Sequence, residues 1–160
     1  SQRKIARFEG TFHGVVDGLH YGYRHPFEAV DCAGITPGAI ADTLILPFND
    51  LERCAAILRA NQDDLAGVIM EPISGVIPGE PAFLAGLRAL TRELGAVLIF
   101  DEVVTGFRMA PGGAQELLGV TPDLTLLGKV LGGGFPVGAV CGRREIMAIL
   151  DPKRPTPERV

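Results

Sequence analysis

The sequence has few cysteines and no apolar run long enough to cross a membrane. Cys32, Cys54 and Cys141 are odd in number and widely spaced, which argues against a disulfide framework or a zinc site and favours reduced thiols used in packing. No apolar run reaches the roughly 18 residues of a transmembrane helix, and the N-terminus is not a signal peptide. The sequence therefore predicts a soluble cytoplasmic protein without a membrane partner.

Basic charge is also scarce. The chain has 15 lysines and arginines against 19 acidic residues, and its formal net charge is -4. This balance, without long basic runs, argues against nucleic acid as a partner and favours a small molecule. The 160 residues, 47% of them hydrophobic, suffice for one domain with a core of its own.

Lysine is rarer than arginine, and one lysine stands in the most apolar stretch of the chain. Lys129 lies between two leucine-rich runs, in the segment 124–134. An ammonium group is costly to bury without a partner, whereas an amine kept neutral by desolvation attacks carbonyl carbons. The alternative is an exposed lysine where a strand meets a loop. The glycines at 132–134 match no nucleotide-binding loop motif, which makes a nucleotide-binding module the weaker interpretation and favours tight packing beside the lysine.

Apolar runs alternate with amphipathic segments, a pattern typical of an α/β fold with a mostly parallel sheet. The expected strands are 4–8, 43–47, 66–70, 96–101, 124–127 and 137–141, and the expected helices are 50–60, 81–94 and 143–150. The segment 20–42 has no sustained period and is predicted to be a long irregular loop. Residues 1–150 form one domain in this interpretation, and the polar, Pro-rich residues 151–160 form a truncated connection in a longer enzyme.

Two carboxylates end the strand 96–101, and Lys129 follows the next strand. Ligands of such folds bind beyond the carboxyl ends of the strands, so Asp101 and Lys129 are expected to face one crevice from neighbouring strands. A carboxylate for a pyridine nitrogen and an amine for an aldehyde are the two groups that pyridoxal phosphate requires of a protein. Without the lysine, a helix cap or a metal-binding carboxylate would be the better explanation of Asp101.

Further candidates lie near other turns. Phe12 precedes a glycine turn, where its ring can stack on a planar cofactor. Glu71 follows the strand 66–70 and is expected either to border the same crevice or to bind loop amides. His13, His20 and His25 are close in sequence, but their spacing does not match a metal site, and no metal is predicted.

With the motifs Phe12-His13-Gly14, Glu71-Pro72, Asp101-Glu102-Val103 and Thr125-Leu-Leu-Gly-Lys129 in this order, the chain resembles the class-III pyridoxal-phosphate aminotransferases. Within that class it is most similar to the glutamate-1-semialdehyde 2,1-aminomutases and their close relatives. The resemblance covers nearly the whole chain.

The resemblance implies the central segment of a fold-type I large domain, with helices on both faces of the sheet, in an enzyme that acts as a homodimer. It implies that Lys129 forms the Schiff base with pyridoxal 5'-phosphate and that Asp101 pairs with the ring nitrogen. Phe12 and Val103 would cover the two ring faces, and His13 and Glu71 would complete the cofactor site. The implied reaction is amino-group transfer, between molecules or within one.

Two differences leave the substrate open. The loop 73–78 is shorter than in the aminomutases and lacks their asparagine, whereas Val104 stands where many aminotransferases have glutamine. The family's phosphate-binding turn and its partner-subunit threonine are expected outside residues 1–160, so these residues alone should bind cofactor poorly and be inactive. The alternative function is a non-catalytic remnant or interaction domain that keeps the fold.

Overall fold

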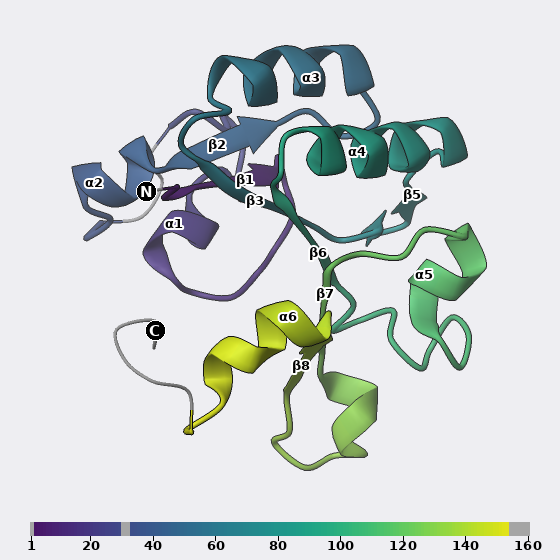
Figure 1. Cartoon of the computed structure of the whole chain (residues 1–160). Coiled ribbons are helices and arrows are strands. Elements are labelled where there is room, and N and C mark those ends of the chain that lie inside the picture. Colours follow the sequence, from purple (N-terminus) through teal and green to yellow (C-terminus); the bar gives the residue numbers. More distant parts are fainter. Residues whose placement is uncertain (1, 30–32, 154–160) are drawn as a thin grey trace.

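The computed structural model, which describes residues 2–29 and 33–153, contains a six-stranded sheet with strand order β2-β1-β3-β6-β7-β8 (Figure 1). Its strands are β1 Lys4–Phe8, β2 Thr43–Leu46, β3 Leu65–Met70, β6 Val97–Asp101, β7 Leu124–Leu127 and β8 Ala139–Gly142. All neighbouring pairs are parallel except β7 and β8, which are antiparallel. The predicted strands and the mostly parallel sheet are confirmed.

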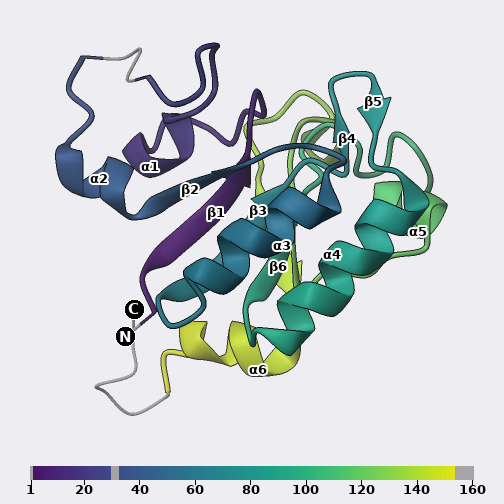
Figure 2. The same cartoon turned by 90° about the horizontal axis from the view of Figure 1, so that it is seen from above.

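The two longest helices, α3 Leu51–Ala60 and α4 Pro81–Glu93, lie side by side over one face of the sheet (Figure 2). The Asp50 carboxylate accepts a hydrogen bond from the Arg53 amide at 3.0 Å, which makes Asp50 the N-cap of α3. Pro81 occupies the first turn of α4, and Gly95, with a φ of 66°, follows its end. The sequence predicted both helices.

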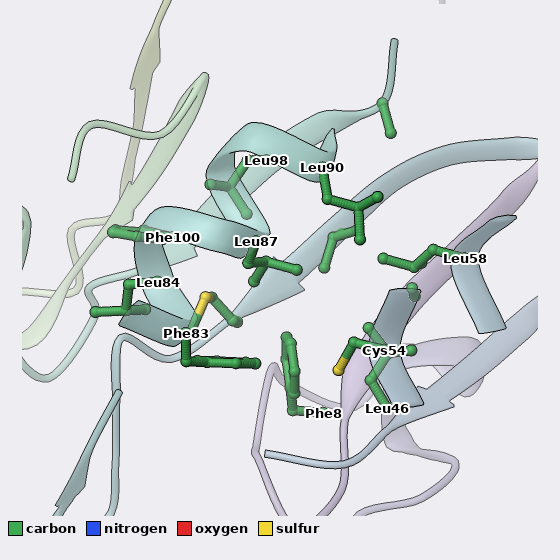
Figure 3. Packing of buried hydrophobic residues seen from close by; sticks show 14 of the residues in the cluster. Phe8, Leu46, Cys54, Leu58, Phe83, Leu84, Leu87, Leu90, Leu98 and Phe100 are labelled. Carbon is green, nitrogen blue, oxygen red and sulfur yellow. The ribbon is translucent and has the colours of Figure 1, made fainter. Parts of the chain in front are cut away.

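The core fills the space between these helices and the sheet (Figure 3). Phe8 of β1 contacts Phe83 of α4 edge to face, with ring centroids 5.8 Å apart. Leu58 and Leu87 are fully buried beside them, and each such side chain contributes about 1.5–3 kcal/mol by leaving water. This core holds the strands in register, and so it fixes the positions of the residues that follow them.

Several short elements differ from the sequence prediction. The segment 20–42 was expected to be irregular, but it contains the end of α1 Asp17–His20 and the whole of α2 Pro37–Ala41. The Thr36 hydroxyl caps α2 by accepting from the Ala39 amide at 3.3 Å. Residues 30–32 of this segment lie outside the described residues, as do residues 154–160 of the predicted tail.

Further short elements lie between the strands and after the last one. The segment 73–78 forms a hairpin of β4 Ile73–Ser74 and β5 Ile77–Pro78, and α5 Gly113–Leu118 was not predicted. The expected helix 143–150 is divided into α6 Arg144–Met147 and the 3-10 helix η2 Ala148–Leu150. Within the described residues, no helix has the length and apolar character needed to span a bilayer.

The cysteines have different environments. Cys54 is buried in α3, where its thiol lies 3.2 Å from the Pro47 carbonyl oxygen and burial raises its pKa to about 12. Cys141 is exposed on β8, the edge strand of this sheet, so within the described residues it does not serve the packing expected of it. Cys32 lies outside the described residues.

A buried carboxylate connects helix α4 to the sheet. Asp123 accepts hydrogen bonds from Arg88 at 2.7 and 3.0 Å, from the Leu98 amide at 2.9 Å and from Arg143 at 3.2 Å. Burial by itself raises the pKa of Asp123, but these hydrogen bonds outweigh it and lower the pKa from 3.8 to about 2. The carboxylate is therefore ionised in the folded protein at pH values where it would be protonated in the unfolded chain.

We expect this difference to appear as acid sensitivity. Asp123 should stabilise the fold fully above pH 4, and its contribution should disappear as the pH falls toward about 2. The pKa difference corresponds to about 2 kcal/mol in the free energy of unfolding. Urea unfolding of the full-length protein at a series of pH values measures it. Asp123→Asn should be less stable at neutral pH and should lose this part of the pH dependence; an unchanged slope would contradict the assignment.

Candidate active site

A cavity of about 370 Å³ opens at the carboxyl ends of β3, β6 and β7. Its lining comes from the loop after β1, from the ends of β6 and β7, from residues that follow the three strands, and from the start of the hairpin. The lining residues are Phe12, His13, Gly14, Glu71, Ile73, Asp101, Val103, Val104, Thr105, Leu126 and Lys129. All six residues predicted to form the cofactor site are among them, although their roles remain predictions.

Asp101 is the last residue of β6, and its carboxylate lines the cavity. Its side chain is 8% exposed. One carboxylate oxygen, Oδ1, accepts from the Val103 amide at 3.1 Å, and the other, Oδ2, lies 2.8 Å from His13 Nδ1. These two contacts fix the plane of the carboxylate, and each oxygen keeps a lone pair that can accept a further hydrogen bond.

Lys129 lines the same cavity but is not buried. It is the first residue of the 3-10 helix η1 Lys129–Gly132, and it is exposed in this chain. The apolar flanks do not enclose the amine, because β7 ends at Leu127 and Val130 and Leu131 are themselves 40% and 36% exposed. The expectation of a desolvated amine is therefore not met in the described residues. Lys129 has a φ of 46°, a backbone conformation that is uncommon for a residue with a side chain.

The walls of the cavity are aromatic and aliphatic. Phe12 is 47% exposed and packs against Tyr23 with ring centroids 5.3 Å apart, while Val103 lies in the turn that follows β6. Glu71 borders the cavity, and its Oε1 accepts from the Phe12 amide at 2.8 Å. Glu71 therefore does both things that its sequence position allowed: it lines the crevice and holds a loop amide.

Glu102, the second carboxylate at this strand end, does not line this cavity. Its side chain is fully buried and accepts from Thr105 Oγ1 at 2.9 Å and from the amides of Ala114 and Gln115 at the start of α5. Adjacent side chains leave a strand on opposite faces. Glu102 therefore stabilises the loop between β6 and α5, and of these two neighbouring carboxylates only Asp101 lines the crevice.

Two buried residues that sequence reasoning missed support the loop that carries Phe12 and His13. Arg7 of β1 is fully buried and donates to the carbonyl oxygens of Thr11 and Leu19. Thr11 is buried beside it, and its hydroxyl lies 3.0 Å from His13 Nε2. The sequence contained one indication of this support, the arginine in the apolar strand Ile5-Ala-Arg-Phe8. A buried guanidinium needs several hydrogen-bond acceptors, so the nearby loop had to supply them.

The three histidines do not form a metal site. His13 lines the cavity, whereas His20 contacts Tyr23 and His25 contacts Phe27. Across residues 2–29 and 33–153, no group of three or more histidine, cysteine or acidic side chains is arranged to hold a metal ion.

Comparison with known proteins identifies relatives over most of the chain. The sequence profile of the family "Aminotransferase class-III" matches residues 1–156. Glutamate-1-semialdehyde 2,1-aminomutase 2 of Brevibacillus brevis is 49% identical over 160 aligned residues, which cover 96% of this chain and 37% of that protein.

Solved structures of transaminases have the same fold. An omega-transaminase from Sphaerobacter thermophilus superposes with a TM-score of 0.91 at 40% identity, over 98% of this chain and 38% of that one. A transaminase with PLP bound superposes with a TM-score of 0.90 at 37% identity, again over 98% and 38%. The chain thus spans well under half the length of the relatives that it matches.

Proposed function

This chain belongs to the class-III aminotransferases, and from that premise we propose that it is the cofactor-binding segment of a longer enzyme that transfers amino groups with pyridoxal 5'-phosphate. The observation that carries the proposal is the placement of Asp101 and Lys129 in one cavity that Phe12 and Val103 also line. Residues 1–150 are the central segment of the large domain in this proposal, and residues 151–160 connect it to the rest of the protein.

The residues of the cavity fit a pyridoxal ring. A volume of about 370 Å³ is within the range of small-ligand sites. The Asp101 carboxylate is buried and has a free lone pair for a protonated ring nitrogen, while Phe12 and Val103 supply apolar surfaces for the ring faces. Lys129 would hold the cofactor covalently through its aldehyde carbon, and its unusual backbone conformation is of a kind that gathers at functional sites.

When bound, pyridoxal phosphate supplies a carbonyl that condenses with amines and a ring that withdraws electrons from the substrate carbon. Asp101 would keep the ring nitrogen protonated by pairing its negative charge with that N–H group. The Lys129 amine would take a proton from the substrate carbon and return it at a neighbouring atom. Glu71 would keep Phe12 over the ring by holding its amide.

The complete protein is proposed to be a homodimer that acts on small amino and carbonyl compounds. The apolar side chains of Phe135, Val137 and Val140, which lie in the edge strand β8 or just before it, are exposed and support a covering surface there. The site is compatible with transfer of an amino group either within one molecule or between two. The B. brevis relative is named an aminomutase, and the S. thermophilus relative is named an omega-transaminase.

Borohydride reduction of the full-length protein tests the proposal. Reduction in the presence of pyridoxal phosphate should fix the cofactor to one peptide, the one that contains Lys129, because a hydride-reduced bond between amine and aldehyde no longer hydrolyses. A screen of amino donors and acceptors should then include glutamate-1-semialdehyde, from which 5-aminolevulinate would identify an aminomutase. Absence of attachment and of turnover would instead indicate a non-catalytic protein that retains the fold.

A further inference from the structure

A continuous chain of buried hydrogen bonds lies behind Asp101. It runs from Arg7 and the Phe8 carbonyl through the Thr11 hydroxyl and the His13 ring to the Asp101 carboxylate. Arg7 is fully buried, Thr11 is 1% exposed, and the His13 side chain is 0% exposed. Because bulk water does not reach these atoms, each hydrogen must be supplied by one of the groups themselves.

The direction of the hydrogen bonds follows from which groups can donate. Thr11 Oγ1 lies 2.7 Å from the Phe8 carbonyl oxygen, and a carbonyl has no hydrogen to give. The single hydroxyl hydrogen of Thr11 must therefore point to Phe8. Arg7 Nη2 lies 3.2 Å from Thr11 Oγ1, and a guanidinium only donates. Thr11 has no second hydrogen for His13, so its contact of 3.0 Å with His13 requires a hydrogen on Nε2.

The other ring nitrogen of His13 faces an acceptor as well. Its Nδ1 lies 2.8 Å from Asp101 Oδ2, and an ionised carboxylate only accepts. A second hydrogen is needed in this contact, and it belongs on the imidazole because a free imidazole is a stronger base than a free carboxylate. We infer that Thr11 is a positioning residue that keeps a hydrogen on both ring nitrogens of His13, so that Asp101 is presented to the cavity as an ionised carboxylate.

The charged groups around the ring are consistent with this arrangement. Asp101 at the end of β6 contacts His13 directly, whereas Arg7 of β1 reaches it only through Thr11. Glu71, at the end of β3, binds the amide of the neighbouring Phe12, and Lys129 lines the same cavity. Burial lowers the pKa of Arg7 to about 10, against an opposing effect of Glu71, so Arg7 stays a donor at neutral pH.

Nitrogen NMR of the full-length protein, labelled with 15N-histidine and prepared without cofactor, tests the inference. At neutral pH both ring nitrogens of His13 should resonate in the range of N–H nitrogens, with the signals assigned by their loss in His13→Asn. Thr11→Val should shift Nε2 to the range of a nitrogen without hydrogen, because a buried N–H group without an acceptor is unfavourable. Thr11→Ser keeps the hydroxyl and should retain the wild-type signals.

Either of two results would overturn the inference: a wild-type His13 with a hydrogen on only one nitrogen, or a Thr11→Val protein with unchanged signals. If Thr11→Val does not fold, the wild-type spectrum and the Thr11→Ser spectrum still show whether both ring nitrogens of His13 carry a hydrogen. The role in presenting Asp101 to a ring nitrogen rests on the proposed function, but the hydrogen positions do not. Failure of cofactor attachment at Lys129 would therefore leave the NMR result standing, and the two failures are distinguishable.

Discussion

Replacing Lys129 with alanine in the full-length protein is expected to abolish borohydride-stable attachment of pyridoxal phosphate and to slow amino transfer by about 10³-fold or more. Two functions disappear together, because the same amine is proposed to hold the cofactor and to move the substrate proton. The cavity itself should persist, since Lys129 is exposed and makes no core contact. Cofactor absorbance after reduction and gel filtration, followed by single-turnover kinetics, measures both losses.

Lys153 provides a matched control. It is an exposed lysine in a turn, away from the cavity, so Lys153→Ala should retain attachment and rate. Lys129→Arg tests charge separately from nucleophilicity: it keeps a cation, but a guanidinium does not lose its proton and cannot attack the aldehyde. If Lys129→Ala keeps attachment, or if Lys129→Arg turns over at the wild-type rate, the lysine is not the residue that holds the cofactor.

Most of the fold could be predicted from local patterns. The strand 4–8 and the helix 81–94 are marked by apolar periods and by Pro81 and Gly95, signals that act within a few residues. The short helix α5 could not be predicted in this way. It begins at glycines and is held by the distant Glu102 carboxylate, so tertiary contacts rather than its own sequence determine it.

The sequence predicted which strand ends carry the candidate site residues, but it did not predict the direction in which their side chains point. Asp101 and Glu102 are chemically alike in sequence. Strand alternation directs them to opposite sides, and the position of α5 determines that Glu102 is the one whose carboxylate is buried. The exposure of Lys129 also depends on tertiary structure, because its apolar neighbours pack only where other elements cover them. Thr11 had no sequence signal at all: its importance comes from the hydrogen-bonding demands of Arg7 and His13.

Asp101→Asn should have the second largest effect, a fall of about 10²- to 10³-fold in kcat with little change in KM. The amide has the shape of the carboxylate but no charge, so it cannot stabilise a protonated ring nitrogen. This stabilisation matters most when electrons move into the ring, and for that reason the loss should appear in kcat. The exposed Asp63 offers a control: Asp63→Asn removes the same charge far from the cavity and should leave the rate unchanged.

The Asp101 variant also separates cofactor chemistry from cofactor binding. Lys129 is intact in Asp101→Asn, so borohydride should still fix the cofactor to it even though turnover is slow. The pH at which the absorbance of the bound cofactor changes should shift, because the ring nitrogen has lost its anionic partner. A variant that retains at least about a third of the wild-type kcat with an unshifted absorbance profile would contradict a ring-nitrogen contact, and Asp101 would then be a structural partner of His13 alone.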